Sequence, residues 1–87
     1  MSANVNTADY SGMWAHHDGD RIYYHQFCVL KKSVEEVQDA FKELVKQKKA
    51  VKGDELEVFR HVLINNYSYQ RFVGHGVVEA HDKVKFD

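Results

Sequence analysis

Proline is absent from this sequence, cysteine occurs once, and no long run of hydrophobic residues is present. The lone Cys28 has no intrachain partner, which excludes a disulfide-stabilised fold and predicts a reducing, cytoplasmic location. No apolar stretch reaches the ~18 residues needed to cross a bilayer, so we expect no membrane association. Without proline, the five glycines are the strongest expected breaks in secondary structure.

The charge is almost balanced, with 12 Lys and Arg against 13 Asp and Glu and a formal net charge of −1. This balance lacks the basic excess of most dedicated nucleic-acid-binding proteins. A chain of 87 residues suits one small domain with a thin core, in which ~60–65% of the unfolded surface is buried. We expect residues 1–8, which are small and polar, to be a disordered leader and residues 9–87 to form a single domain.

The first structural signal is a pair of aromatic-rich runs on either side of Asp18-Gly19. This dipeptide favours a type I′ turn, so the pattern predicts a β-hairpin over about residues 10–31. Apolar side chains occur on both alternating faces of residues 22–30. We therefore expect either a central strand or a strand whose second face is covered by another subunit.

The next segment has the strongest helical pattern. Ser33 and Glu36 form a capping box, and apolar residues then recur at helical spacing around Val37 and Phe41. Acidic residues begin this segment and lysines end it, as the helix dipole favours. The pattern predicts a helix over residues 34–50, with Gly53 as the stop.

A second capping box, Asp54 with Glu57, begins the segment 55–66. A strand is the alternative, because this segment is rich in β-branched residues that share an alternating face. In a strand Arg60 would interrupt that apolar face, so we favour a second helix over 55–66.

Gly74 and Gly76 predict a bend, and the alternation over 77–86 predicts a final strand that returns to the N-terminal hairpin. The expected order is then β-β-α-α-β. This is an α+β fold in which two helices pack on a small antiparallel sheet.

The six histidines are the first candidates for chemistry. On a strand, His16 opposes His17, and His25 opposes Cys28, so a metal site built from these residues is weakly supported. A histidine-based metal or catalytic site, including His81 beside Asp82, stays open as a second alternative. No nucleophile, phosphate-binding or dinucleotide-binding motif is present, so we expect no enzymatic activity and no cofactor.

Aromatic residues make up 13% of the chain, which is more than a thin core readily hides. Large amphipathic rings favour protein interfaces, so we expect a small protein-interaction module: a regulator, adaptor or inhibitor that forms a homodimer and binds an unidentified protein. The interaction residues that this predicts are Tyr23, Tyr24, Phe27, Tyr67, Tyr69 and Phe72. The alternative is weak nucleic-acid binding through the basic cluster around residues 42–52, namely Lys46, Lys48, Lys49 and Lys52.

Overall fold

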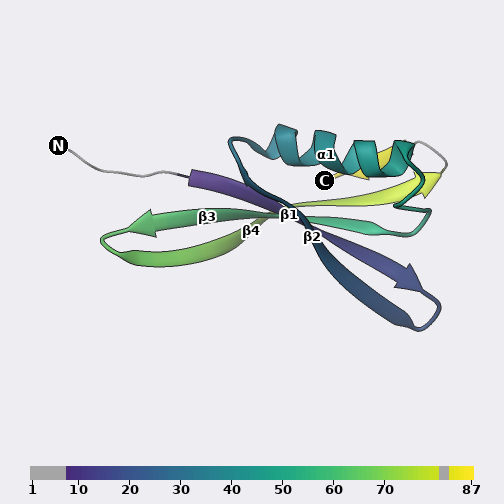
Figure 1. The fold of residues 1–87 in the computed structure, drawn as a ribbon, viewed down its shortest axis with the longest axis horizontal. Helices are drawn as coiled ribbons and strands as arrows, with labels where there is room; N and C mark the ends of the chain where they lie inside the picture. Colours follow the sequence, from purple (N-terminus) through teal and green to yellow (C-terminus); the bar gives the residue numbers. More distant parts are fainter. Residues whose placement is uncertain (1–7, 81–82) are drawn as a thin grey trace.

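The protein folds as a twisted antiparallel sheet with one helix packed on one face (Figure 1). The computed structural model describes residues 8–80 and 83–87. The elements in chain order are β1 (Ala8–Asp18), β2 (Arg21–Lys31), α1 (Val34–Lys46), β3 (Glu55–Ile64), β4 (Tyr67–Ala80) and β5 (Lys83–Phe86). The five strands lie in the order β2-β1-β3-β4-β5, and each neighbouring pair is antiparallel. No helix in the described ranges has the length and apolar character needed to cross a membrane.

The predicted N-terminal hairpin is confirmed, but its turn differs from the one expected. Asp18 pairs with Arg21, so Gly19 and Asp20 occupy the turn. Gly19 has a φ of 62°, whereas Asp20 does not have a positive φ. A positive φ at the first turn residue alone is the pattern of a type II′ turn, so the type I′ prediction was wrong.

The predicted first helix is confirmed, and it begins at the predicted residue, Val34. The hydroxyl of Ser33 accepts a hydrogen bond from the backbone N–H of Glu36 at 3.2 Å, as the capping box requires. The helix ends at Lys46 rather than at residue 50. Lys48 adopts a φ of 60° just beyond the end, so a lysine in the left-handed region stops the helix well before Gly53.

The predicted second helix is absent from the described ranges, and the order β-β-α-α-β was wrong. Residues 55–64 form β3, which pairs with β4 through a two-residue turn. Asn65 and Asn66 in that turn have φ values of 50° and 69°, which is the type I′ requirement of two positive φ angles. The Asp54 carboxylate does not cap a helix, because it binds groups on β1 and the preceding loop instead.

The predicted bend at Gly74 and Gly76 was also wrong, because both residues lie inside β4. A Cβ atom on Gly76 would lie 2.8 Å from the Phe86 ring, so this glycine makes room for a side chain on β5. The C-terminal strand β5 pairs with β4 and does not reach the N-terminal hairpin, which joins the sheet through β1 and β3.

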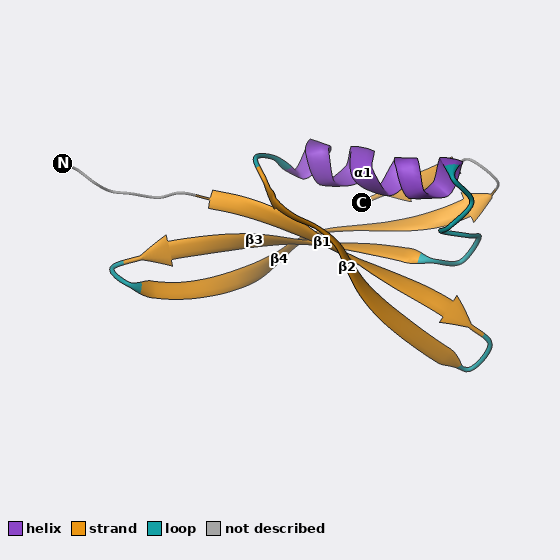
Figure 2. Ribbon diagram, viewed as in Figure 1, coloured by secondary structure: helices purple, strands orange, loops and turns teal. Residues whose placement is uncertain are grey.

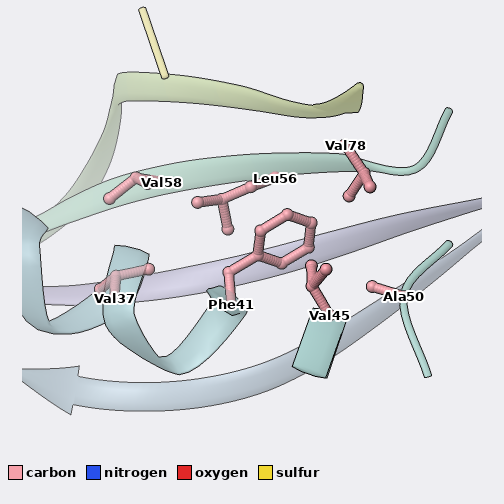
Figure 3. Close-up of a cluster of buried hydrophobic side chains, with 7 residues drawn as sticks. All are labelled: Val37, Phe41, Val45, Ala50, Leu56, Val58 and Val78. Atoms are coloured by element: carbon pink, nitrogen blue, oxygen red, sulfur yellow. The ribbon is translucent and has the colours of Figure 1, made fainter. Parts of the chain in front are cut away.

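The hydrophobic core lies between α1 and the middle of the sheet. Figure 3 shows Phe41 pointing from α1 toward Leu56 on β3. The fully enclosed residues are Val37, Phe41, Val45, Ala50, Leu56, Val58 and Val78. This core is small, and α1 covers only part of the sheet, so both long hairpins extend past it (Figure 2).

The molecule is elongated as a result. Its dimensions are 49 × 24 × 20 Å, and its radius of gyration is 14.4 Å. A compact domain of this length has a radius of gyration of about 12 Å. The β1–β2 and β3–β4 hairpins point in opposite directions along the molecule (Figure 1).

Candidate functional site

The part of the β3–β4 hairpin that projects past α1, residues 59–73, is called the arm here. Three of the predicted interaction residues lie on it, with Tyr67 76%, Tyr69 50% and Phe72 55% exposed. Leu63, Ile64 and Val73 add further exposed apolar surface.

Both faces of the arm carry apolar side chains. Ile64 pairs with Tyr67 on the face that α1 covers further along the sheet. Phe59 pairs with Phe72 on the opposite face, where their rings meet edge to face at 5.9 Å. The arm is therefore an apolar hairpin that the rest of the described chain does not enclose.

Two arginines lie directly opposite each other at the base of the arm. Arg60 on β3 pairs with Arg71 on β4, and such like charges facing across a strand pair repel. The Arg60 Nε atom is buried and has no hydrogen-bond partner among the described residues. Residues 59–73 contain no aspartate or glutamate, so the arm is a basic as well as an apolar surface.

The predicted interaction residues of the N-terminal hairpin divide between surface and core. Tyr23 and Tyr24 on β2 are exposed. Phe27 instead packs toward the core, with its ring 5.9 Å from that of Phe41. Phe27 is therefore partly buried against the core, unlike the two tyrosines.

The predicted basic cluster lies at the other end of the molecule from the arm. Lys46 ends α1, and Lys48, Lys49 and Lys52 are exposed in the loop that follows. This loop leads into the start of β3, whereas the tip of the arm follows its end (Figure 1). The lysines and the arm aromatics therefore do not form one continuous surface.

Asp54 is a fully buried carboxylate at the start of β3. It accepts hydrogen bonds from Trp14 Nε1 at 2.9 Å, His16 Nδ1 at 2.9 Å and the backbone N–H groups of His17 and Val51 at 3.1 and 3.0 Å. Burial alone would raise the pKa of Asp54, but these hydrogen bonds outweigh it and lower the pKa below its usual value. The carboxylate thus ties β1 to the loop after α1.

A chain of hydrogen bonds crosses the sheet face opposite α1, and we call it the histidine chain. His17 Nε2 and His75 Nε2 each lie 2.7 Å from a different oxygen of the Glu55 carboxylate. His75 Nδ1 lies 3.0 Å from a carboxylate oxygen of Asp87. The histidine chain therefore joins β1, β3, β4 and the C-terminal residue.

The geometry favours the charged form of His75. Both ring nitrogens face carboxylates, which accept but do not donate when ionised, so only the doubly protonated ring can donate to both. The hydrogen bond to Glu55, and then the one to Asp87, raise the pKa of His75. The hydrogen bond from His75 in turn is the largest influence on the pKa of Glu55, and together with a smaller contribution from His17 it lowers that pKa despite the opposing effect of burial.

The histidines do not gather into one centre. His16 and His17 meet different carboxylates, Asp54 and Glu55, as expected for adjacent strand residues. His25 and Cys28 share a face, contrary to expectation, because an irregularity at Phe27 shifts the register between β1 and β2.

Within residues 8–80 and 83–87, no group of three or more His, Cys, Asp or Glu side chains is arranged so that it could hold a metal ion. His81 and Asp82 lie outside the described residues. Burial raises the pKa of the Cys28 thiol, which disfavours the reactive thiolate.

Asp54, Glu55 and Asp87 were not identified as partners of histidines from the sequence. The only available signal was the adjacency of two carboxylates in Asp54-Glu55, which mirrors the adjacency of His16 and His17. Comparison with known proteins gives no match to any family model, curated protein or solved structure.

Proposed function

We propose that this protein acts by binding another protein through its arm. The observation that carries the proposal is an apolar hairpin exposed on both faces and projecting beyond the core. The lone Cys28 supports placing this interaction in a reducing compartment such as the cytoplasm.

The size of the exposed surface supports an interface. A fully buried aromatic side chain accounts for about 150–250 Å², so Tyr67, Tyr69 and Phe72 together expose roughly 300–450 Å². The three aliphatic side chains of the arm add to this exposed apolar area, which is divided between the two faces of the hairpin. Exposed apolar surface of this extent is typical of a binding site.

The side chains of the arm indicate which groups the surface of the partner should carry. Because both faces are apolar, a groove that encloses the hairpin would bury more of it than a flat surface would. The facing Arg60 and Arg71, in a segment without acidic residues, favour carboxylates at the rim of that groove. We therefore propose a partner with an apolar groove that carries acidic groups at its entrance.

The tyrosines suit this role energetically. Tyrosine offers a large contact area with few rotatable bonds, so ordering it on binding costs little conformational entropy. The strand pairing of the arm places Tyr69 opposite Val62 and Tyr67 opposite Ile64, which sets the backbone positions from which these side chains project before binding. Residues of this kind are typical hot spots of interfaces.

The nucleic-acid alternative has less support. Aromatic side chains that stack on bases normally interleave with the basic residues that follow the phosphate backbone. Here the lysines 46–52 lie at and beyond the end of α1, at the opposite end of β3 from the tip of the arm, so Arg60 and Arg71 are the only lysine or arginine residues among the arm aromatics. The metal alternative also has less support, because His16, His17 and His75 are engaged with carboxylates.

A photo-crosslinking experiment tests the proposal. A photoreactive amino acid replaces Tyr69 in one sample and the exposed helix residue Lys42 in another, and both are irradiated in native lysate. We expect discrete adducts from position 69 alone. Excess unlabelled wild-type protein should suppress them, whereas excess Tyr69→Ser, Arg71→Glu protein should not.

Two results would contradict the proposal. Equal adducts from positions 69 and 42 would mean that the arm has no preferred partner. Suppression of the adducts by the Tyr69→Ser, Arg71→Glu protein would mean that another surface makes the contact.

A further inference from the structure

We propose that two copies of this protein associate edge to edge, with β2 of one copy antiparallel to β2 of the other. This self-association uses a surface separate from the arm and does not depend on the proposed arm partner. The resulting contact is isologous, as in most homodimers.

The first argument is that β2 is an open edge. It is the outermost strand of the sheet, and among the described residues only β1 pairs with it. The backbone N–H and C=O groups on its outer side therefore have no strand partner in the described chain. Such an edge is a template for pairing with another strand.

The second argument is that this edge carries little of the usual protection. Natural edge strands are commonly short, contain proline or carry charged residues, especially lysine. The residues between Arg21 and Lys31 include no lysine, arginine, aspartate, glutamate or proline. The opposite edge shows the contrast, because β5 is short and carries Lys83 and Lys85.

The third argument is the exposed apolar surface along the regular part of the edge. Arg21 to Gln26 pair with β1 without interruption, and the register shifts begin beyond Gln26. Within that stretch Ile22, Tyr23 and Tyr24 are 47%, 42% and 58% exposed. Ile22 and Tyr24 lie on one face and Tyr23 on the other, so a paired strand would cover apolar side chains on both faces.

The charge distribution selects a second copy in the antiparallel orientation. The start of β2 has Asp18, Asp20 and Arg21, with a net charge of −1, whereas its end carries Lys31 and Lys32. Antiparallel self-pairing over residues 21–26 places Lys31 and Lys32 of each copy beyond the turn of the other, on the side of its Asp18 and Asp20. Parallel pairing would bring like charges together.

The strength of the contact follows from its size. The register shifts restrict regular pairing to residues 21–26 of each copy, which is a smaller contact than the ~1,600 Å² of a standard interface. We therefore expect a dissociation constant in the micromolar range rather than the nanomolar range.

Sedimentation equilibrium of the purified full-length chain at tens of micromolar tests this proposal. The wild-type protein should approach twice the monomer mass of 10.1 kDa. Tyr24→Lys adds a charge to the edge, and the two-fold symmetry places it in the dimer twice, so the dissociation constant should rise by about tenfold or more. The matched control is Tyr67→Lys, which makes the same change on the arm and should leave the dimer intact.

Each outcome decides the proposal. A monomeric wild-type protein would overturn it, as would a dimer that Tyr67→Lys breaks and Tyr24→Lys does not. A series of larger species would mean that the edge does not form a closed pair, and would also overturn it. Tyr24→Lys leaves the arm unchanged. Photo-crosslinking from position 69 in the Tyr24→Lys protein therefore tests the proposed arm function separately from dimer formation.

Discussion

Removing the Asp54 carboxylate should destabilise the protein more than any other single polar substitution on the sheet. Asp54→Ala leaves the Trp14 indole N–H and the backbone N–H groups of His17 and Val51 without their acceptor. A buried donor without a partner costs about 1–3 kcal/mol, so the three donors together should cost at least about 3 kcal/mol. Removing one partner of a buried charged contact typically costs about 3–5 kcal/mol, and we expect a loss in that range. His16 adds little, because its side chain is 31% exposed and its ring can turn to water.

Asp54→Asn should cost less, and the difference follows from which oxygen each donor uses. Oδ2 accepts from Trp14, His16 and Val51, whereas Oδ1 accepts only from the backbone N–H of His17. An asparagine that keeps its oxygen at the Oδ2 position retains three acceptor contacts and turns its amide toward the His17 N–H. We therefore expect a cost of about 1–3 kcal/mol for Asp54→Asn.

Urea unfolding followed by the fluorescence of Trp14 measures both variants, because Trp14 is the only tryptophan and donates to this carboxylate. The control is Asp39→Ala, an exposed helix carboxylate whose loss should change stability by less than about 0.5 kcal/mol. A cost below about 1 kcal/mol for Asp54→Ala would refute the reasoning, because solvent or another group would then be satisfying the three donors.

The lowered pKa of Asp54 also predicts how the free energy of unfolding in the same experiment depends on pH. Its pKa is lower in the folded state than the unfolded value of about 3.9, so its stabilising contribution is present above that value. The contribution is lost as the pH falls through the folded pKa. Asp54→Asn should remove this part of the acid-induced loss of stability.

Three further predictions concern other parts of the fold. Because the pKa of His75 is raised in the folded state, His75 contributes to the free energy of unfolding below about pH 6.5, and this contribution is lost as the pH rises through the folded pKa. His75→Gln should flatten that part of the plot of unfolding free energy against pH. An unchanged plot would exclude the predicted link between His75 protonation and stability. Lys48→Gly should stabilise the protein by about 0.5–1 kcal/mol in urea unfolding, because glycine adopts the positive φ at this position without strain, and a loss of stability would mean that the lysine side chain matters more. Gly12→Ala should cost about 1–3 kcal/mol by thermal unfolding, because the added Cβ would lie 2.7 Å from Val37 Cγ1; a neutral result would show that the core can shift to admit it.

The elements that the sequence predicts correctly are those with local signals. The capping box at Ser33 and the helical spacing after it identify α1 within a few residues of its ends. The paired aromatic runs around Gly19 identify the first hairpin, because the strands and their turn are adjacent in the chain. Only the turn type is wrong there, since it depends on which two residues occupy the turn.

The error at β3 came from a local signal that long-range contacts override. Asp54 and Glu57 have capping-box spacing, but the Asp54 side chain binds Trp14 and the loop at Val51 instead. The decisive signal was Asn65-Asn66, which suits the positive φ angles of a hairpin turn between two β-rich runs. Arg60 does lie on the apolar face of β3, but near the base of the arm rather than in the enclosed core.

The histidine chain was beyond prediction from one sequence. His17, Glu55 and His75 come from three strands, so their contacts depend on the register of two strand pairings. A shift of one residue in either pairing would turn one of these side chains to the other face. By contrast, the exposure of Tyr67 and Tyr69 was predictable, because the surplus of aromatic residues already exceeded what a thin core can hold.

The most direct test of the proposed function is a calorimetric titration of the captured partner with the wild-type protein and with arm variants. Tyr69→Ser and Phe72→Ser should each weaken binding by about tenfold or more, as expected for hot-spot residues. Replacing Lys46, Lys48 and Lys49 with serine should leave the affinity unchanged, and raising the salt concentration should weaken binding only modestly. Full affinity in the arm variants, with binding lost in the lysine variant and a steep salt dependence, would contradict the account and favour a nucleic-acid ligand.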